Sequence, residues 1–572
     1  MRRTLINMCM LGALAALPLS GMILAAAPAS ADAVVDAAMN GNRDAVRALL
    51  KDGADVNTAQ ADGMTALHWA AQKGDVDLAK VLLYASANVR ATTRIGGYTP
   101  LLIASRNGDA AVMQALVDGG ADPNNETTNG TTALMFAAAA GRNDAVKLLI
   151  EKGANVNAKE NVKGETALTF AAAYGRLDVV RELTAHKADV SVTTKVQDLS
   201  AFAKEEQERF LAERGGQQGR GGRGGEGRGP QGPQIPGVNR QYNYTELVAY
   251  WGGLTPLHLA ARQGYTDVAN ALLDAGADID QRTTGDQSTP LVIAIVNGRF
   301  DLAKQLIDRG ANSNLAQANN GVTPLYAALN CQWSDKALYP QPRAFEQQNT
   351  SYLDLMKALL DKGANPNARL TRKVWYSQYD FDQSGVDETG ATPFFRAAYA
   401  ADVDGMKLLL QYGADPYVTT MRTPGRVRTG DVTREVQDVS PLPPVPPGGP
   451  AISPLLAASG EGYGEGFAAN HHHHSPAGML PAVKFLVEEV GIDVNVKDHD
   501  GNTPVHNAAA RGDNEMIQYL VSKGADVKQV NREGKTTVDM ANGPVQRISP
   551  FPDTIKLLEG MGVKNNHKCV SC

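Results

Sequence analysis

Two cysteines at the end of the sequence have the spacing best suited to chemistry. Cys569 and Cys572 are separated by two residues, as in redox disulfides, half zinc sites and c-type haem attachment motifs. A haem motif also needs a histidine directly after its second cysteine, and none follows Cys572. Three interpretations stay open: an inert or disulfide-closed tail, a redox or metal-binding pair, and a shortened haem module.

Histidines are the second group with chemical potential. The run His471–His474 lies in a loop rich in glycine, and imidazoles bind zinc, copper and nickel. Adjacent residues of a regular backbone cannot all point at one metal ion, so we predict no metal site and no cofactor. Asp498–Asn502 partly resembles a calcium loop, but Ala509 stands where the closing glutamate is required. We expect an ordinary turn there.

The elements that must position any such group are set by a repeat. A threonine or serine followed by proline or alanine, and usually by leucine, returns along the chain at intervals of 33 or 34 residues, interrupted by longer gaps. A second marker, glycine and alanine followed by aspartate or asparagine, trails most copies. The copies of the first marker begin at Thr65, Thr99, Thr132, Thr166, Thr255, Thr289, Thr323, Thr392, Ser453, Thr503 and, in weak form, Thr536.

The copy that begins at Thr255 shows why each unit forms two helices. Threonine is a good N-cap, and the proline after it costs nothing because that N–H has no partner within the helix. Gly264 and Gly276 end the two helices where a left-handed backbone is needed. Leu272 belongs to the apolar face of the second helix. One unit cannot bury that face alone, so the copies must stack.

The N-terminus has the pattern of an export signal. Arg2 and Arg3 precede an apolar stretch, and Ala29-Ser30-Ala31 supplies the small residues that a signal peptidase accepts. We predict cleavage after Ala31 and an exported protein, periplasmic or secreted. A retained membrane anchor is the alternative, but Pro18 interrupts the apolar stretch. We expect no stable membrane insertion after cleavage.

The two markers together resemble the ankyrin repeat, over roughly three quarters of the predicted mature chain. The resemblance implies an all-α repeat solenoid: about eleven helix-turn-helix and β-turn repeats with long loop insertions, capped by a half repeat from Val34 to Asn57. His68, His258 and His506 occupy the histidine position of the repeat motif. There the resemblance implies hydrogen bonds to the backbone between repeats rather than catalysis.

Insertions divide the array. The Gly/Arg-rich tract of the first one resembles RNA-binding segments, but few arginines leave a flexible loop as the preferred interpretation. We divide the sequence as follows: a signal peptide at 1–31; N-terminal repeats with their capping half repeat at 32–195; a charged helix and a Gly/Arg-rich flexible insertion at 196–251; central repeats at 252–417, with insertions near 331–352 and 370–388; a Pro-rich linker at 418–452; C-terminal repeats at 453–563; and a tail with the two cysteines at 564–572.

Nothing in the sequence indicates an enzyme. It contains no phosphate loop, nucleophile elbow or H-E-x-x-H motif, and no segment outside the repeats is long enough for a catalytic domain. The formal net charge of −6 gives no reason to expect a nucleic acid partner. We predict a monomeric, non-catalytic scaffold that binds a protein; the alternative is an envelope redox, metal or haem protein that uses Cys569 and Cys572.

The resemblance also implies where a partner would bind. In ankyrin repeats the partner faces the concave surface, just before the threonine of each copy and late in the first helix. An aromatic-rich loop at 370–388 is a further candidate, unless its rings fold back on the array. The residues predicted to contact a partner are Met64, Tyr98, Arg106, Tyr174, Trp251, Arg262, Trp375 and Tyr376.

Overall fold

The fold is a succession of helix pairs joined by long loops. The computed structural model describes residues 32–202, 204–205, 209, 244–333, 343–374, 386–424, 438–462, 473–543 and 549–568. This part of the chain divides into two compact units, one made of residues 32–104 and 111–122, the other of residues 105–110 and everything from Pro123 on. The predicted repeat solenoid is confirmed.

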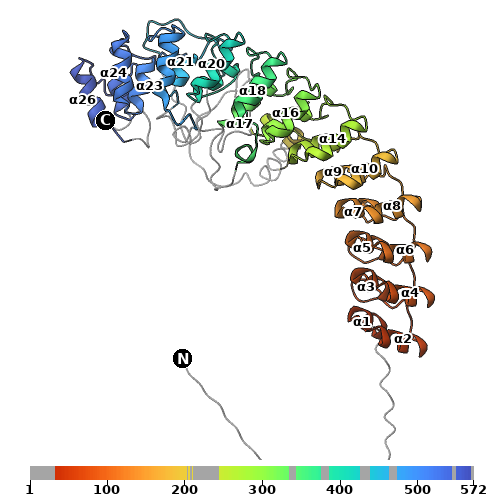
Figure 1. The fold of residues 1–572 in the computed structure, drawn as a ribbon. Helices are drawn as coiled ribbons and strands as arrows, with labels where there is room; N and C mark the ends of the chain where they lie inside the picture. The colour runs from red at the N-terminus through yellow and green to blue at the C-terminus, as the bar shows by residue number, and fades with distance from the viewer. Residues whose placement is uncertain are drawn as a thin grey trace, which may run out of the picture. The chain divides into compact units, whose positions relative to one another are not determined.

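Each repeat contributes a first and a second helix, and Figure 1 shows the pairs in chain order. The pairs are α1 (Ala33–Met39) with α2 (Arg43–Lys51), α3 (Ala66–Lys73) with α4 (Val76–Tyr84), α5 (Pro100–Asn107) with α6 (Ala110–Asp118), α7 (Ala133–Ala140) with α8 (Asn143–Glu151), α9 (Ala167–Ala173) with α10 (Leu177–Ala185), α13 (Pro256–Gln263) with α14 (Thr266–Asp274), α15 (Pro290–Val296) with α16 (Phe300–Asp308), α17 (Pro324–Gln332) with α18 (Tyr352–Asp361), α19 (Pro393–Tyr399) with α20 (Val403–Gln411), α21 (Pro454–Ala458) with α22 (Met479–Lys484) and the π-helical turn η3 (Phe485–Glu489), α23 (Pro504–Ala510) with α24 (Asn514–Ser522), and α25 (Thr537–Ala541) with α26 (Pro552–Gly560).

The helix starts and stops follow from the repeated markers. Thr255 caps α13: its hydroxyl accepts the N–H of His258 at 3.3 Å, and the His258 ring accepts the N–H of Thr255 at 3.2 Å. This reciprocal pair is a capping box, and it recurs at several first helices. Gly264 ends α13 with a φ of 79°, in the left-handed region. The sequence pattern therefore sets both ends of the first helix.

Small side chains let the first helices stack in the second unit. Ala260 and Ala261 of α13 are fully buried, and their size lets α13 approach both α9 and α15 closely. The same succession continues through α17, α19 and α21, and α23 packs on α25. Second helices pack beside one another in the same order, for example α8 with α10 and α10 with α14. The core is thus continuous from repeat to repeat.

Asparagine side chains join successive loops. In each case the side-chain oxygen of one repeat accepts a backbone N–H of the next, which explains the asparagine that often stands two residues after the second sequence marker. Asn314 shows the full pattern: its Oδ1 accepts the N–H of Asn365 at 2.7 Å, and its Nδ2 donates to the carbonyl of Gly363 at 2.7 Å. Further acceptors of this kind are Asn57, Asn124, Asn157, Asp280, Asn367 and Asn495.

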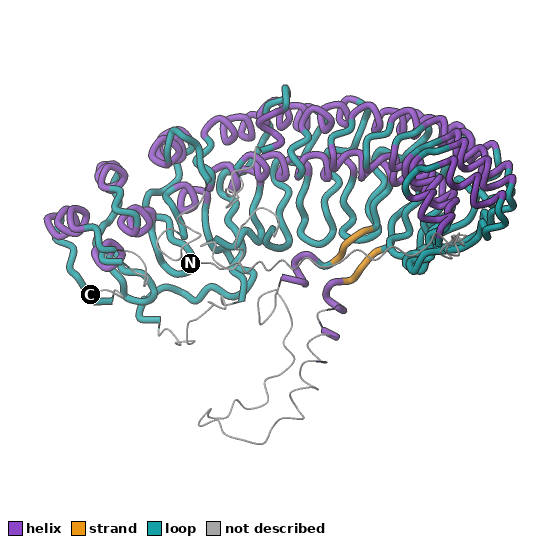
Figure 2. Tube along the Cα trace, turned by 90° about the horizontal axis from the view of Figure 1, so that it is seen from below, coloured by secondary structure: helices purple, strands orange, loops and turns teal. Residues whose placement is uncertain are grey.

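The first insertion leaves and re-enters the array at one place. Strand β1 (Val196–Asp198) pairs antiparallel with β2 (Tyr250–Gly252), which follows the short helix α12 (Tyr244–Val248). Figure 2 shows the two strands side by side among the loops. Just inside the pair, the N–H of Thr194 donates to the carbonyl of Leu254 at 3.0 Å. This small sheet departs from the all-α expectation, and it lets α13 pack directly on α9.

The other elements outside the pairs are short. The 3₁₀ turn η1 (Ala344–Gln347) lies between α17 and α18, and its Phe345 stacks on Phe300 with ring centroids 5.8 Å apart. At the N-terminus, α1 and α2 form a complete helix pair where the sequence predicted a half repeat. Among the described residues, no helix has both the length and the apolar character needed to cross a bilayer.

Candidate partner-binding surface

The candidate surface consists of the loop ends before each first helix, here called the fingers, and the C-terminal ends of the first helices. In the second unit, Trp251 lies on β2 with 61% of its surface exposed, and Tyr174 follows α9 with 54% exposed. Arg106 and Arg262, late in α5 and α13, are exposed as well. These four predicted residues are therefore accessible to a partner.

Two predicted residues in the first unit, Met64 and Tyr98, are half-buried and contact other residues of the array. Tyr98 is half-buried, its carbonyl oxygen lies 3.0 Å from Nε2 of His68, and its ring covers Gly96 so closely that a Cβ there would come within 2.6 Å. Met64 is also half-buried, and its carbonyl accepts the N–H of Gln60 at 2.9 Å. Both side chains have structural neighbours and present less surface than Trp251.

Exposed aromatic side chains gather in the two repeats that flank the first insertion. Tyr250 is 42% exposed and lies over Gly285, where a Cβ would be 3.1 Å from the tyrosine Cβ. Tyr265, 37% exposed, lies against Gly175, the residue directly after Tyr174. The sequence analysis missed both tyrosines. One signal could have identified Tyr265. It stands directly before a second helix, at the position that Arg176 and Arg299 occupy in the neighbouring repeats.

Two glutamates, Glu160 and Glu165, lie on the finger before α9, and their surroundings shift their pKa values in opposite directions. Burial raises the pKa of Glu165, and the positive charge of Arg262 opposes that shift only in part. Burial also acts on Glu160, but there the N–H groups of Glu165, Val162 and Lys163 outweigh it and hold the pKa below its ordinary value. Glu160 is therefore a structural carboxylate, whereas Arg262 remains exposed on the surface.

The three motif histidines are buried within the array. The ring of His258 lies 3.0 Å from the carbonyl oxygen of Ser288 in the next finger, and His68 repeats this bond with the carbonyl of Tyr98. Burial lowers the pKa of His258 and of His506 to about 4. For His68 and His258, the bonds implied by the resemblance are present.

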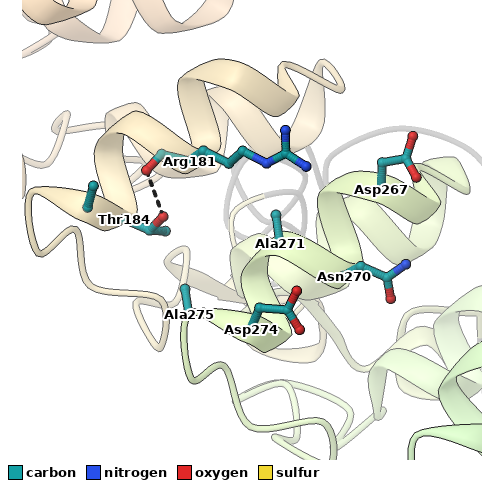
Figure 3. A pocket seen from close by; sticks show the side chains of 8 residues that line it. Arg181, Thr184, Asp267, Asn270, Ala271, Asp274 and Ala275 are labelled. Carbon is teal, nitrogen blue, oxygen red and sulfur yellow. Dashed lines mark hydrogen bonds between the residues drawn. The ribbon is translucent and has the colours of Figure 1, made fainter.

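A surface groove runs along the line where the second helices α10 and α14 pack together, and Figure 3 shows it from close by. It has a volume of about 600 Å³ and is open to solvent. Asp274 is paired with Arg309 at 2.6 Å, so part of its charge is already compensated. Mixed charges and small alanines give it no definite ligand chemistry. The lining residues are Arg181, Thr184, Ala185, Asp267, Asn270, Ala271, Asp274 and Ala275.

A buried polar cluster surrounds Trp333, which sequence reasoning did not single out. Its indole N–H donates to Asp402 at 2.9 Å, and its carbonyl accepts a guanidinium N–H of Arg396 at 2.6 Å. Burial raises the pKa of Asp402, although the N–H groups of Gly405 and Trp333 favour its charged form. The ring of His473 lies 5.3 Å from that of Trp333. The cluster joins α17, α19 and α20.

Several predicted residues lie outside the described part of the chain. These are Trp375 and Tyr376 of the aromatic loop, Cys569 and Cys572 of the tail, and the first two histidines of the run at 471–474. Within the residues that the structure describes, no group of three or more histidine, cysteine, aspartate or glutamate side chains is placed to hold a metal ion. The interpretations of the two cysteines therefore stay predictions.

Known families match the chain along most of the described repeats. A family model described as ankyrin repeats (3 copies) matches residues 34–127, 101–194 and 257–370. A second model, ankyrin repeats (many copies), matches residues 470–521. The crystal structure of the human ASB11 ankyrin repeat domain is also similar, with a TM-score of 0.33 and 24% identity over 46% of this chain and 90% of that one.

Similar proteins share only part of their length with this chain. Protein phosphatase 1 regulatory subunit 12A of Mus musculus is 39% identical over 71 residues, 12% of this chain and 7% of that protein. Protein phosphatase 1 regulatory subunit 27 of Mus musculus is 34% identical over 90 residues, 16% of this chain and 53% of that protein. The matches to both relatives thus cover repeats rather than whole proteins. Since the two family models together match more than half of the sequence, and the helix pairs follow the same period, this chain belongs to the ankyrin-repeat family.

Proposed function

We propose that this protein is a non-catalytic scaffold that binds a partner protein on the fingers and first-helix ends of its repeats. The observation that carries the proposal is the group of exposed aromatic side chains around the first insertion, above all Trp251 and Tyr174. Large aromatic residues supply much of the affinity of protein interfaces because they bury a large area with few rotatable bonds. Two such rings around one insertion, rather than a single exposed side chain, are what favours a binding surface here.

The position of the aromatic group supports the same function. Trp251 belongs to a strand that is hydrogen-bonded to β1, so its backbone is fixed before any partner arrives. Arg262 lies late in the neighbouring first helix and is exposed. Rigid aromatic groups beside an accessible arginine are typical of interface hot spots. The two relatives named as regulatory subunits of a protein phosphatase are consistent with a role in binding another protein.

The test is affinity capture with cross-linking, using the full mature chain as bait. Replacing Trp251 and Tyr174 together by alanine should weaken capture of a saturable partner at least tenfold. Tyr84 is the matched control, since it is 95% exposed at the end of α4 and lies far along the chain from the insertion. Unchanged capture by the double variant, or an equal loss with Tyr84→Ala, would remove this surface from the function.

We also propose that the protein works outside the cytoplasm, in the bacterial envelope or beyond it. The support is the sequence alone: Arg2, Arg3 and the apolar stretch that precedes Ala31. Mass analysis of the N-terminus of the exported protein tests this proposal. A chain that begins at Asp32 in the periplasmic or secreted fraction supports it, and an intact Met1 on protein that stays in the cytoplasmic fraction would contradict it.

A further inference from the structure

The Pro-rich segment that the sequence predicted to be a linker contacts two later repeats. Its described part begins at residue 438 and returns to its own finger where the N–H of Arg422 donates to the carbonyl of Gly449 at 2.8 Å. Before that return, residues 438–445, here called the strap, lie on the fingers that precede α23 and α25. The strap therefore contacts residues of these fingers that lie about 60 to 95 positions further along the chain.

One arginine holds the strap. Arg532 is fixed to the preceding finger, because its backbone N–H donates to the carbonyl of Asp500 at 2.8 Å and its Nε donates to the carbonyl of His499 at 2.7 Å. Its two terminal nitrogens are then free to face the strap. Nη1 contacts the carboxylate of Asp438 at 2.7 Å and the carbonyl of Leu442 at 3.2 Å. Nη2 donates to the carbonyl of Pro443 at 2.5 Å.

The backbone and two glycines complete the contact. The N–H of Val439 donates to the carbonyl of Arg532 at 2.9 Å, which adds the strap to the finger by a main-chain bond. The side chain of Leu442 lies over Gly501, where a Cβ would be 3.1 Å from its methyl group. The side chain of Val439 lies over Gly534 in the same way, at 2.9 Å. The two fingers thus offer a flat floor with room for small apolar side chains.

The chemistry of the strap matches this receptor. Prolines at positions 441, 443 and 444 remove three backbone donors, and the segment bends at residues 440–442, where Oδ1 of Asp438 accepts the N–H of Ser440 at 2.9 Å. Such a segment presents mainly carbonyl acceptors, so it needs a receptor that supplies donors, and a guanidinium supplies several in one plane. The acidic residue at the beginning of the strap adds a charge-assisted bond to the same group. Arg532 satisfies both needs.

We propose that the fingers around Arg532 form a docking site for proline-containing peptide segments that begin with an acidic residue, and that the strap occupies this site in cis. The occupied site closes the C-terminal fingers to a partner until the strap leaves. This docking site is a second surface, separate from the exposed aromatic group around the first insertion. Its ligands are acidic, proline-containing peptides, and the strap competes with them. Both ends of the strap belong to the same array, so a high effective concentration lets a small contact keep the site filled.

The experiment measures binding of a fluorescent peptide with the sequence of residues 437–446 to the full chain. Wild-type protein should bind it weakly, because the strap competes. In Asp438→Ala the strap loses its charged contact with Arg532, so the peptide should bind at least tenfold more tightly. Adding Arg532→Ala to that variant should abolish the gain. Equal binding by wild type and Asp438→Ala, or a gain that survives Arg532→Ala, would overturn the proposal.

Hydrogen exchange separates release of the strap from unfolding. In Asp438→Ala the amide of Val439 should exchange faster than in wild type, while the amide of Arg532, which bonds to Asp500, should keep its protection. Loss of protection at both amides, or no change at Val439, would contradict a strap that detaches on its own. A peptide in which Pro443 and Asp438 exchange places serves as the composition control, and it should not bind Asp438→Ala.

Discussion

Acidification should weaken the array through the buried histidines, and His258 offers the sharpest test. The folded protein holds this imidazole neutral with a pKa of about 4, whereas in the unfolded chain the ordinary value is 6.5. Between these values the unfolded chain binds a proton that the folded chain refuses. Its contribution is therefore fully present above pH 6.5 and falls as the pH decreases towards 4. The bond to the carbonyl of Ser288 and the negative charge of Asp286 oppose the burial effect on this pKa only in part.

The size of the effect follows from the two pKa values. At pH 5 the proton taken up by the unfolded chain lowers the free energy of unfolding by about 2 kcal/mol relative to pH 7.5. His258→Gln should remove that part of the pH dependence. Glutamine can still form the capping box with Thr255, so the helix start is kept while the titrating group is lost. The variant should be less stable than wild type at pH 7.5 but lose less stability on acidification.

The assay is urea unfolding followed by circular dichroism at pH 7.5 and pH 5.0, for wild type, His258→Gln and the control His186→Gln. His186 lies on the exposed surface at the end of α10, so its replacement controls for the loss of an imidazole that is not buried in the array. If His258→Gln kept the full wild-type loss between the two pH values, buried neutral histidine would not be the cause.

Three further substitutions test the packing. Gly264→Ala should lower the free energy of unfolding by about 1–2 kcal/mol, because the backbone of Gly264 is left-handed. It should cost more than Gly276→Ala, because of these two positions only at Gly264 would a Cβ also displace the side chain of Arg299. Thermal unfolding of the two variants compares these costs. Asn314→Ala should cost about 1–2 kcal/mol for its two lost hydrogen bonds, whereas Asn314→Asp, which keeps the acceptor, should cost less in urea unfolding; equal losses would contradict a role for the acceptor. Trp333→Phe should cost about 1–3 kcal/mol because it removes the indole donor from the buried carboxylate of Asp402, which keeps the N–H of Gly405, while Trp251→Phe should leave the midpoint of unfolding unchanged within error.

The sequence predicted those features of the fold that depend on short stretches of chain. The threonine caps and the glycine stops identify the first helices because each signal lies within a few residues of the element it controls. At the N-terminus the sequence predicted a half repeat, with the pattern of a second helix and a helical piece before it. Helix α1 lacks the threonine marker, yet Val34, Val35 and Ala38 are buried like their counterparts in complete repeats. Its place in the stack, rather than its local sequence, makes it a first helix.

The contacts that the sequence could not predict join residues far apart in the chain. Trp333 bonds to Asp402 across the two insertions of the central repeats, and Arg532 bonds to Asp438 across two helix pairs. Both contacts depend on how far an insertion reaches and where it returns, and neither length nor composition determines that path. The candidate surface was predicted in part. The positions of Trp251 and Tyr174 in the repeat pointed to these two residues, whereas the exposure of Tyr250 on β2 became clear only from the structure.

The pairing of β1 with β2 also has a practical consequence. The pair brings the two ends of a long excursion to adjacent backbone positions, and Leu247 and Val248 of α12 are buried at its base. The array therefore offers a graft point between Phe202 and Tyr244, which leaves that base in place. A fluorescent or affinity module with neighbouring termini could replace the intervening residues and report on a bound protein, without adding mass to either end of the chain.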